Sequence, residues 1–535
     1  MPQLTQPTPG EINYAIGLLK AQRNNEAIDF LSRLNRKHSL SVPVIQLLSN
    51  AYIAISDYKL AINEYVKLVK IDAHNTTVLK NLGTMYFKNG EPEQALNNYF
   101  QVIEIAPNDP EVYYKIGNLY FETNNLNLAI DNYEVAIKLR PNFFNALYNL
   151  GNIFLTLKNF PKSVEVFKKC LVINPNHTGM LGNLGIALLE LGKVEKSIEI
   201  FTKLIQLAPS ALAKEYLGRA LLLKCQFNKG WEYYEARLDD VKKYPVFLKQ
   251  KAIANWNGEK GKDVFLCLEQ GIGDQIMFLS LAKEAQKLCK SLTILVDERI
   301  REICKRSLPN INFISTSEEL DAIDFDYQLP IGSLPKLFRN NEIDFQKQKI
   351  GYFRANQSYA EHLKKKLKLH DAPLIGISWA SFNCINSDKK SIALKNFRNV
   401  LVNFNCDIIN LQYGNVDKEV EEFTNATNLN FINNHGVDVY NDIEGLAALI
   451  EICDLIITIP NVTVQLSGAL GKKGWVIVPF SPNFNWTIDK ATSLWYPNIN
   501  IYRQKKINDW TEVLTELESE ALNYLDILNN SKAID

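Results

Sequence analysis

Small and bulky side chains recur along the first 240 residues with a period of 34 residues. A small position in each period is followed twelve residues later by a second one, and four residues after that by a bulky one. Small residues on two helices let their backbones approach, while the bulky side chain fills the remaining gap. The pattern predicts about seven stacked helical hairpins over 11–240. The first small positions are Ala15, Ser49, Gly83, Gly117, Gly151, Gly185 and, one residue early, Gly218.

Four prolines mark the ends of the central hairpins, because proline cannot continue a helix. They are Pro107, Pro141, Pro175 and Pro209. With its 34-residue period and these prolines, the segment resembles the tetratricopeptide repeat. The resemblance implies an α-solenoid that presents an extended binding surface without specifying the partner.

After residue 240 the period stops, and short apolar runs alternate with helical spacing. This alternation is typical of βαβ units with parallel sheets. We expect strands over 262–268, 292–296, 373–379, 406–411, 454–459 and 475–479, with a helix over 276–288. The implied fold is an α-solenoid followed by a two-lobed, Rossmann-like α/β domain. Its lobes span 263–360 and 373–515, linkers span 241–262 and 361–372, and a helix or tail spans 516–535.

The charge balance, 59 basic against 59 acidic residues, argues against a nucleic-acid partner. No run reaches the roughly 18 apolar residues of a membrane span, and the start lacks a secretory pattern, so we expect a cytoplasmic protein. The six histidines and eight cysteines show no metal-ligand spacing, so we expect neither a metal nor another cofactor.

The sharpest local motif lies between the first expected strand and its helix, at 269–275. Gly271 and Gly273 allow a ligand to approach the backbone closely, which makes them candidates for phosphate binding. Asp274 falls near the start of the helix, where a carboxylate is favoured. It is either a helix cap or a catalytic group. The motif is not the dinucleotide fingerprint, because Ile276 stands where a third glycine is needed.

The second half as a whole resembles the heptosyltransferase-type glycosyltransferases of glycosyltransferase family 9, in the form fused behind tetratricopeptide repeats. The resemblance implies a GT-B fold that inverts configuration without a metal while moving a sugar from a nucleotide-sugar donor. It also implies that Asp274 is the catalytic base. The segments that carry it are 269–274, 376–379, 387–392, 466–472, 494–497 and 502–504.

Lys389 and Lys390 match a basic position that faces the donor phosphates in that family. A lysine supplies a point charge there without the fork of arginine. The alternative is that both lysines are solvated charges on a polar loop.

A second candidate phosphate site is the strand-to-helix junction at 459–471, because a helix N-terminus offers free N–H groups. Asn461 and Thr463 add hydrogen-bonding side chains, or merely cap the helix. Many relatives have a histidine where this chain has Gln465, and Pro460 is a further departure. Glutamine donates a neutral hydrogen bond but carries no charge. These two departures put activity in doubt more than fold.

Asparagine recurs two residues before the small position in four of the seven hairpins, at Asn13, Asn81, Asn149 and Asn183. In the repeats of the O-linked N-acetylglucosamine transferases, such asparagines hold an extended peptide. A similar ladder here implies a protein acceptor. The alternative is that they are ordinary helix-surface residues.

The sequence therefore predicts a glycosyltransferase whose repeats recruit a protein or surface-glycan acceptor. The alternative is a non-catalytic repeat scaffold with a degenerate glycosyltransferase domain.

Overall fold

The computed structural model describes residues 6–38, 40–239, 253–316, 319, 323–367, 369, 373–382, 387–404, 406–433 and 435–532. The chain forms two compact units, residues 1–187 and 188–535. Residues 241–252 of the first predicted linker, 368 and 370–372 of the second, and 533–535 of the tail lie outside the described residues. Among the helices that are described, none combines the length and apolar run needed to cross a membrane.

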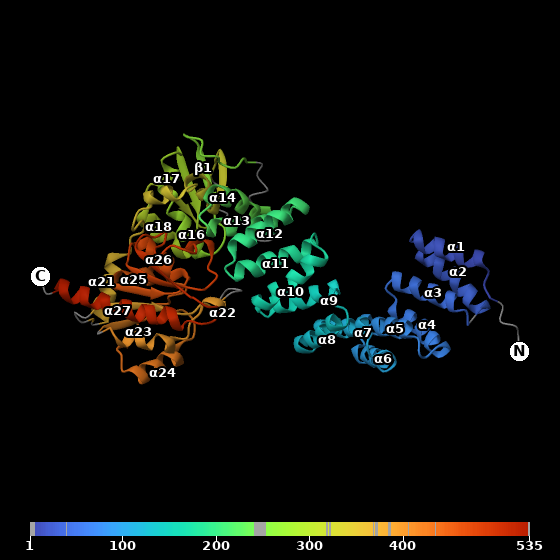
Figure 1. Cartoon of the computed structure of the whole chain (residues 1–535). Coiled ribbons are helices and arrows are strands. Elements are labelled where there is room, and N and C mark those ends of the chain that lie inside the picture. Colours follow the sequence, from blue (N-terminus) through green and yellow to red (C-terminus); the bar gives the residue numbers. More distant parts are fainter. Residues whose placement is uncertain are drawn as a thin grey trace. The chain divides into compact units, whose positions relative to one another are not determined.

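The first unit consists of helical hairpins, in the order that the period predicts (Figure 1). Its helices are α1 (Pro9–Lys20), α2 (Asn24–Lys37), α3 (Val42–Ala54), α4 (Tyr58–Ile71), α5 (Thr76–Lys88), α6 (Pro92–Ile105), α7 (Pro110–Glu122), α8 (Leu126–Leu139), α9 (Phe144–Thr156), α10 (Phe160–Ile173) and most of α11 (Thr178–Glu190). The helices α6, α8 and α10 each end two residues before a proline of the predicted set.

The small–bulky pairing explains why these hairpins close. A Cβ atom added at Gly117 would lie 2.7 Å from the Tyr133 ring, and one added at Gly151 would lie 2.5 Å from the Phe167 ring. Real Cβ contacts are never this short, so only glycine lets the two helices of a hairpin meet around the aromatic side chain. Each hairpin packs on its neighbours through small, separate apolar clusters.

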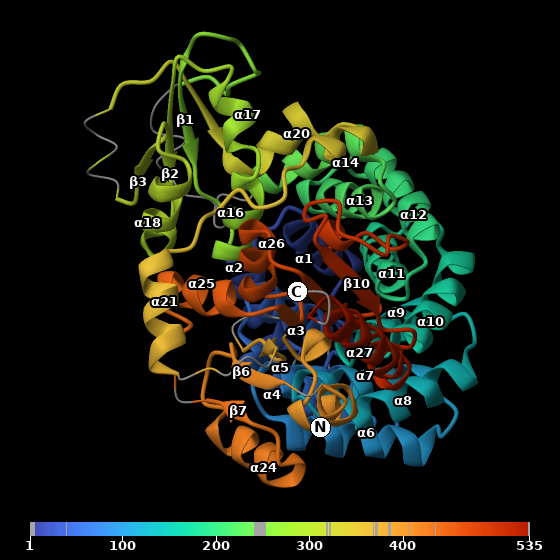
Figure 2. The same cartoon turned by 90° about the vertical axis from the view of Figure 1, so that its left-hand side faces the viewer.

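The second unit begins within α11 and continues through α12 (Val194–Leu207), α13 (Ala211–Leu223), α14 (Phe227–Tyr234) and the 3₁₀ turn η1 (Glu235–Asp239). These elements share one apolar core with both lobes of the α/β region, including Trp231, Phe278 and Phe484. Figure 2 shows α13 and α14 beside α20 (Leu334–Phe338). The compact units therefore divide about fifty residues before the predicted domain boundary at 240.

The first lobe holds a four-stranded parallel sheet in the order β3-β2-β1-β4. Its strands are β1 (Asp263–Cys267), β2 (Ser291–Leu295), β3 (Asn312–Ile314) and β4 (Tyr327–Pro330). The expected helix over 276–288 is two helices, α16 (Ile272–Leu279) and α17 (Ala282–Gln286). The remaining elements are α18 (Glu298–Ser307), η2 (Ile331–Ser333), α20, η3 (Glu342–Lys347) and α21 (Gln357–Lys366), whose last turns occupy part of the second predicted linker.

The second lobe holds a six-stranded parallel sheet in the order β10-β9-β8-β5-β6-β7. Numbered within the lobe this order is 6-5-4-1-2-3, that of the doubly wound folds that bind ligands where the order reverses, here between β5 and β8. The strands are β5 (Leu374–Ser378), β6 (Asp407–Asn410), β7 (Phe431–Ile432), β8 (Leu455–Thr458), β9 (Gly474–Val478) and β10 (Ile499–Arg503). The other elements are α22 (Ser387–Lys390), η4 (Leu394–Phe397), α23 (Arg398–Val402), α24 (Asp417–Thr427), α25 (Ile443–Ile452), α26 (Val462–Leu470), η5 (Phe484–Trp486) and α27 (Thr511–Lys532).

Candidate functional site

Asp274 lies in the first turn of α16, beyond the carboxyl end of β1. Gly271 is the N-cap of this helix, and no side chain caps it. Within the described residues, the Asp274 carboxylate accepts no hydrogen bond and joins no ion pair. Burial and, second, the Glu269 carboxylate raise the pKa of Asp274 to about 6, while Arg219 and Lys390 act in the opposite sense. A carboxylate with this proton affinity and with free oxygens is suited to accept a proton near neutral pH.

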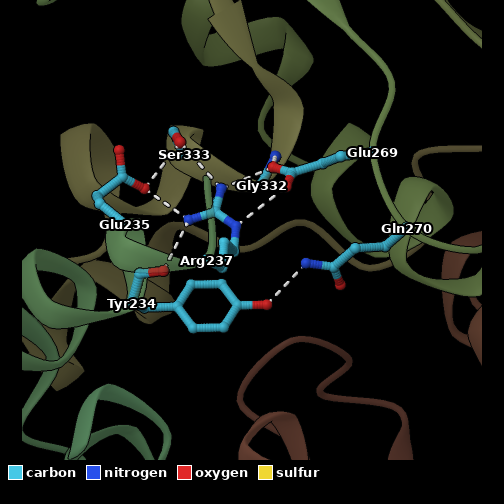
Figure 3. Close-up of polar contacts among 7 residues, drawn as sticks. All are labelled: Tyr234, Glu235, Arg237, Glu269, Gln270, Gly332 and Ser333. Carbon is cyan, nitrogen blue, oxygen red and sulfur yellow. Dashed lines mark hydrogen bonds and ion pairs between the residues drawn. The ribbon is translucent and has the colours of Figure 1, made fainter. Parts of the chain in front are cut away.

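Glu269, the first residue of the same loop, is held by the end of the repeats (Figure 3). Arg237 of η1 donates to its two carboxylate oxygens at 3.0 and 2.6 Å, and both side chains are 1% exposed. The backbone N–H of Gly332 donates to Glu269 at 2.7 Å. Although burial alone lowers it, the Glu269 charge raises the pKa of Arg237 above its ordinary value. Glu269 therefore anchors the loop, with both of its carboxylate oxygens already hydrogen-bonded.

Gln270 takes the left-handed backbone conformation, with φ 63°. Its side-chain amide donates to the hydroxyl of Tyr234 at 2.7 Å, again from the last repeat (Figure 3). A residue other than glycine rarely adopts this conformation unless its surroundings hold it there. Two consecutive residues of the loop are thus tied to α14 and η1.

The second lobe contributes the junction between β8 and α26, at the point where the strand order reverses. Asn461 is the N-cap of α26: its carbonyl oxygen accepts from the backbone N–H of Val464 at 3.4 Å, and its amide donates to Ser378 at the end of β5 at 2.8 Å. Lys390 donates to the carbonyl oxygen of Pro460 at 2.9 Å and forms no ion pair with any described carboxylate. An uncompensated lysine at a helix N-terminus is an arrangement that attracts an anion.

Gln465 brings the two lobes together. The α16 backbone at Gly273 lies against the Gln465 side chain: a Cβ atom placed there would be in ordinary van der Waals contact with it, at 3.4 Å. The Gln465 carbonyl oxygen accepts from the hydroxyl of the buried Tyr496 at 2.7 Å. Thr463, two residues earlier, is buried. The structure thus brings Gly273, Asp274, Lys390 and Gln465, which come from three distant segments of the sequence, to one region of the second unit.

Lys389 has a different environment from Lys390. Its ammonium group lies 2.5 Å from the carboxylate of Glu190, at the end of α11. This ion pair neutralises Lys389 and joins α22 to the repeats.

The asparagines of the predicted ladder have unequal environments. Asn13 is exposed on α1, whereas Asn81, Asn149 and Asn183 are half-buried. Asn149 donates to Asn118 at 2.9 Å, and Asn183 donates to Asn152 at 2.7 Å. Lys115, at the equivalent position, donates to Thr84 at 3.0 Å. These bonds link neighbouring hairpins, so part of the hydrogen-bonding capacity of the ladder serves the stacking of the repeats.

The sequence analysis did not identify the groups that surround Asp274 from the repeats and from the far end of the chain. They are Arg219, Tyr234 and Tyr496. The only available signal was Arg219, a charged residue directly after the small position of the last hairpin. Nothing in the 34-residue period distinguishes a repeat that packs on another repeat from one that packs on the lobes.

Comparisons with known proteins agree with the repeats. Family models described as "TPR repeat" match residues 83–124 and 117–158, and models described as "Tetratricopeptide repeat" match 144–177 and 178–211. Protein FlbA of Caulobacter vibrioides is 24% identical over 331 residues, which cover 57% of this chain and 54% of that protein. The chain thus spans about half the length of this curated relative.

Two solved structures are similar to parts of the chain. The crystal structure of MamA is 25% identical, with a TM-score of 0.28, and the match covers 30% of this chain and 93% of that one. The C-terminal part of a TPR repeat-containing protein from Cytophaga hutchinsonii is 21% identical, with a TM-score of 0.37, covering 43% and 97%. The family models show that the chain has tetratricopeptide repeats, a protein-interaction module, and the structure shows an α/β region with parallel sheets after them.

Proposed function

We propose that the chain is an inverting, metal-independent glycosyltransferase with a GT-B fold, whose repeats recruit a protein or surface-glycan acceptor. The observation that carries the proposal is Asp274: a half-buried carboxylate without a hydrogen-bond partner among the described residues, whose pKa is raised to about 6. It belongs to the same group as Lys390 and the N-terminus of α26. A base and an anion site at the carboxyl ends of two parallel sheets suit transfer from a nucleotide sugar.

In this mechanism an acceptor hydroxyl loses its proton to Asp274 while its oxygen attacks the anomeric carbon of the donor sugar. The new C–O bond forms as the bond from that carbon to the phosphate oxygen breaks. The departing nucleoside diphosphate takes the electron pair, and its charge is stabilised by Lys390 and the free N–H groups of α26. A single displacement of this kind inverts the configuration at the anomeric carbon.

The experiment is a calorimetry and thermal-shift panel of UDP-, GDP-, ADP- and CMP-linked sugars. Wild type is compared with Lys390→Ala and with Lys395→Ala, which removes an exposed lysine from the next element as a matched control. We expect one nucleotide to stabilise the wild type and the control but to bind Lys390→Ala at least about tenfold more weakly. Asp274→Asn should bind that nucleotide normally and lose transfer.

The second candidate function is a repeat scaffold without catalysis. It is favoured by Gln465, whose carbonyl oxygen is occupied by Tyr496 and which carries no charge. A folded wild type that binds none of the nucleotide sugars would select this alternative.

A further inference from the structure

We propose that Arg237, in the turn after the last repeat, is a positioning residue of the candidate site: through Glu269 it fixes the loop that carries Asp274. The inference rests on the proposed function because it takes Asp274 as the reacting group. It deepens that function by making the end of the repeats a working part of the site and not only a recruiting surface.

The Arg237 guanidinium joins three segments that are distant in sequence (Figure 3). It donates to the Tyr234 carbonyl oxygen at 3.2 Å and to Glu235 at 2.7 Å, at the end of the repeats. It donates to Glu269 after β1 and, at 2.9 Å, to Ser333 after β4. A guanidinium is planar and its five N–H groups point in fixed directions, so this set of partners fixes the orientation of the Glu269 side chain.

The position of Glu269 determines that of Asp274 because the loop between them is short. Gln270 is held with a positive φ by Tyr234, Gly271 caps α16, and Asp274 follows in the first turn. The backbone N–H of Asp274 donates to the Gly271 carbonyl oxygen at 3.1 Å. A shift of residues 269–270 therefore moves the start of α16 and the carboxylate on it. A displacement of about 1 Å at a reacting group is enough to slow a reaction by about a hundredfold.

Arg237 also balances charge beside the site. The groups that face Asp274 come from its own loop and from four other segments: Glu269, Arg219, Lys390, Tyr234 and Tyr496. Glu269 is the carboxylate among them, and Arg237 is its cation. Without Arg237, the buried Glu269 and the half-buried Asp274 would be two uncompensated carboxylates in one region, and such a pair binds a proton more tightly in the folded state than in the unfolded one.

The same lobe offers a matched control. Arg339 is as deeply buried as Arg237 and pairs with Glu284 at 2.6 and 3.0 Å. Glu284 is 29% exposed, and neither residue contacts the loop at 269–274 through a hydrogen bond or ion pair. Arg339→Met thus removes a buried arginine of the same lobe without touching the candidate site.

The test compares Arg237→Met, Arg339→Met and the double variant Arg237→Met/Glu269→Gln in the full-length protein. Hydrogen exchange is measured for residues 269–275, and urea unfolding is measured from pH 5 to pH 9. We expect both single variants to lower the urea midpoint. Only Arg237→Met should speed exchange in the loop, by more than about tenfold. The stability that Arg237→Met loses relative to the wild type should grow as pH rises, because the Glu269–Asp274 pair binds a proton more tightly in the folded variant than in the unfolded one. In the double variant, Glu269→Gln should abolish this dependence of the loss on pH.

The proposal would be overturned if the loop exchanged equally fast in Arg237→Met and Arg339→Met and if the stability that each variant loses relative to the wild type did not vary with pH. Arg237 would then only stabilise the fold. If Arg237→Met does not fold, Arg237→Lys keeps the charge but loses the fork, and the deciding result is then whether the loop exchanges faster in Arg237→Lys than in Arg339→Lys. None of these measurements needs a substrate. A failed nucleotide panel would therefore refute the proposed function and leave the exchange and unfolding results unchanged. Contrary exchange and unfolding results would refute the role of Arg237 and leave the nucleotide panel unchanged.

Discussion

Hairpins with the same 34-residue pattern pack in two different ways in this chain. Over residues 12–120 the hairpins contact their neighbours through small apolar clusters that involve adjacent repeats only. In residues 188–535 the last hairpins share a continuous core with both lobes. The comparison teaches that a repeat pattern specifies how two helices pair but leaves open what the outer faces of the pair pack against.

Deletion of the last hairpins gives the largest expected effect. A chain that starts at residue 178 should fold, whereas one that starts at residue 253 should fail to fold, because the core around Trp231 would be exposed. Near-ultraviolet circular dichroism and size-exclusion chromatography measure the difference. A monomeric, cooperatively unfolding 253–535 fragment would show that the last hairpins are dispensable.

A single core residue tests the same point with a smaller change. Trp231 donates its indole N–H to the Arg339 carbonyl oxygen at 2.7 Å, and its ring contacts Phe484 and Trp495. We expect Trp231→Ala to cost about 3–5 kcal/mol, all of it in the second unit. Urea unfolding with hydrogen exchange assigned by region checks this. Tyr133→Ala is the control, and it should weaken the first unit alone.

Overpacking a hairpin of the first unit should have a smaller, local effect. In Gly117→Val the new side chain would collide with Tyr133, since even a Cβ atom lies 2.7 Å from the ring. We expect a loss of about 1–3 kcal/mol that leaves the second unit unchanged. A matching loss of exchange protection in the lobes would contradict the separation of the two units.

The smallest expected effect is a gain of stability. Because the pKa of Asp274 is raised to about 6 from an ordinary value of 3.8, its ionised form is disfavoured in the folded state. The folded protein therefore loses stability as pH rises from about 4 to above 6. Asp274→Asn should add about 1–2 kcal/mol at pH 8, after allowance for partial exposure, and almost nothing near pH 4. Thermal unfolding over this pH range measures it, and a gain that is the same at pH 4 and pH 8 would exclude a raised pKa.

Much of the fold was predictable from local patterns. The small and bulky positions predict the repeats. Continuous apolar runs predict β1, β5, β8 and β9, because a strand inside a parallel sheet is buried on both faces. The two-residue strand β7 and the break between α16 and α17 give no comparable signal. The compact units divide within α11 and not at the predicted end of the repeats at 240, because that end was inferred from the period, whereas the shared core depends on long-range packing.

The candidate site was predictable only in part. Gly273, Asp274, Lys390 and Gln465 were chosen from motifs, and the structure brings them together. The ion-pair partners of two adjoining residues, Arg237 for Glu269 and Glu190 for Lys389, were not predicted, because 32 and 199 residues separate the members of these pairs. Tertiary ion pairs of this kind have no local sequence signature.

The order of the segments along the chain has a consequence for biosynthesis. Arg237 precedes Glu269 by 32 residues, so a ribosome completes α13, α14 and η1 before β1 and its loop emerge. The helices whose side chains complete the core of the α/β lobes are therefore made before the lobes themselves.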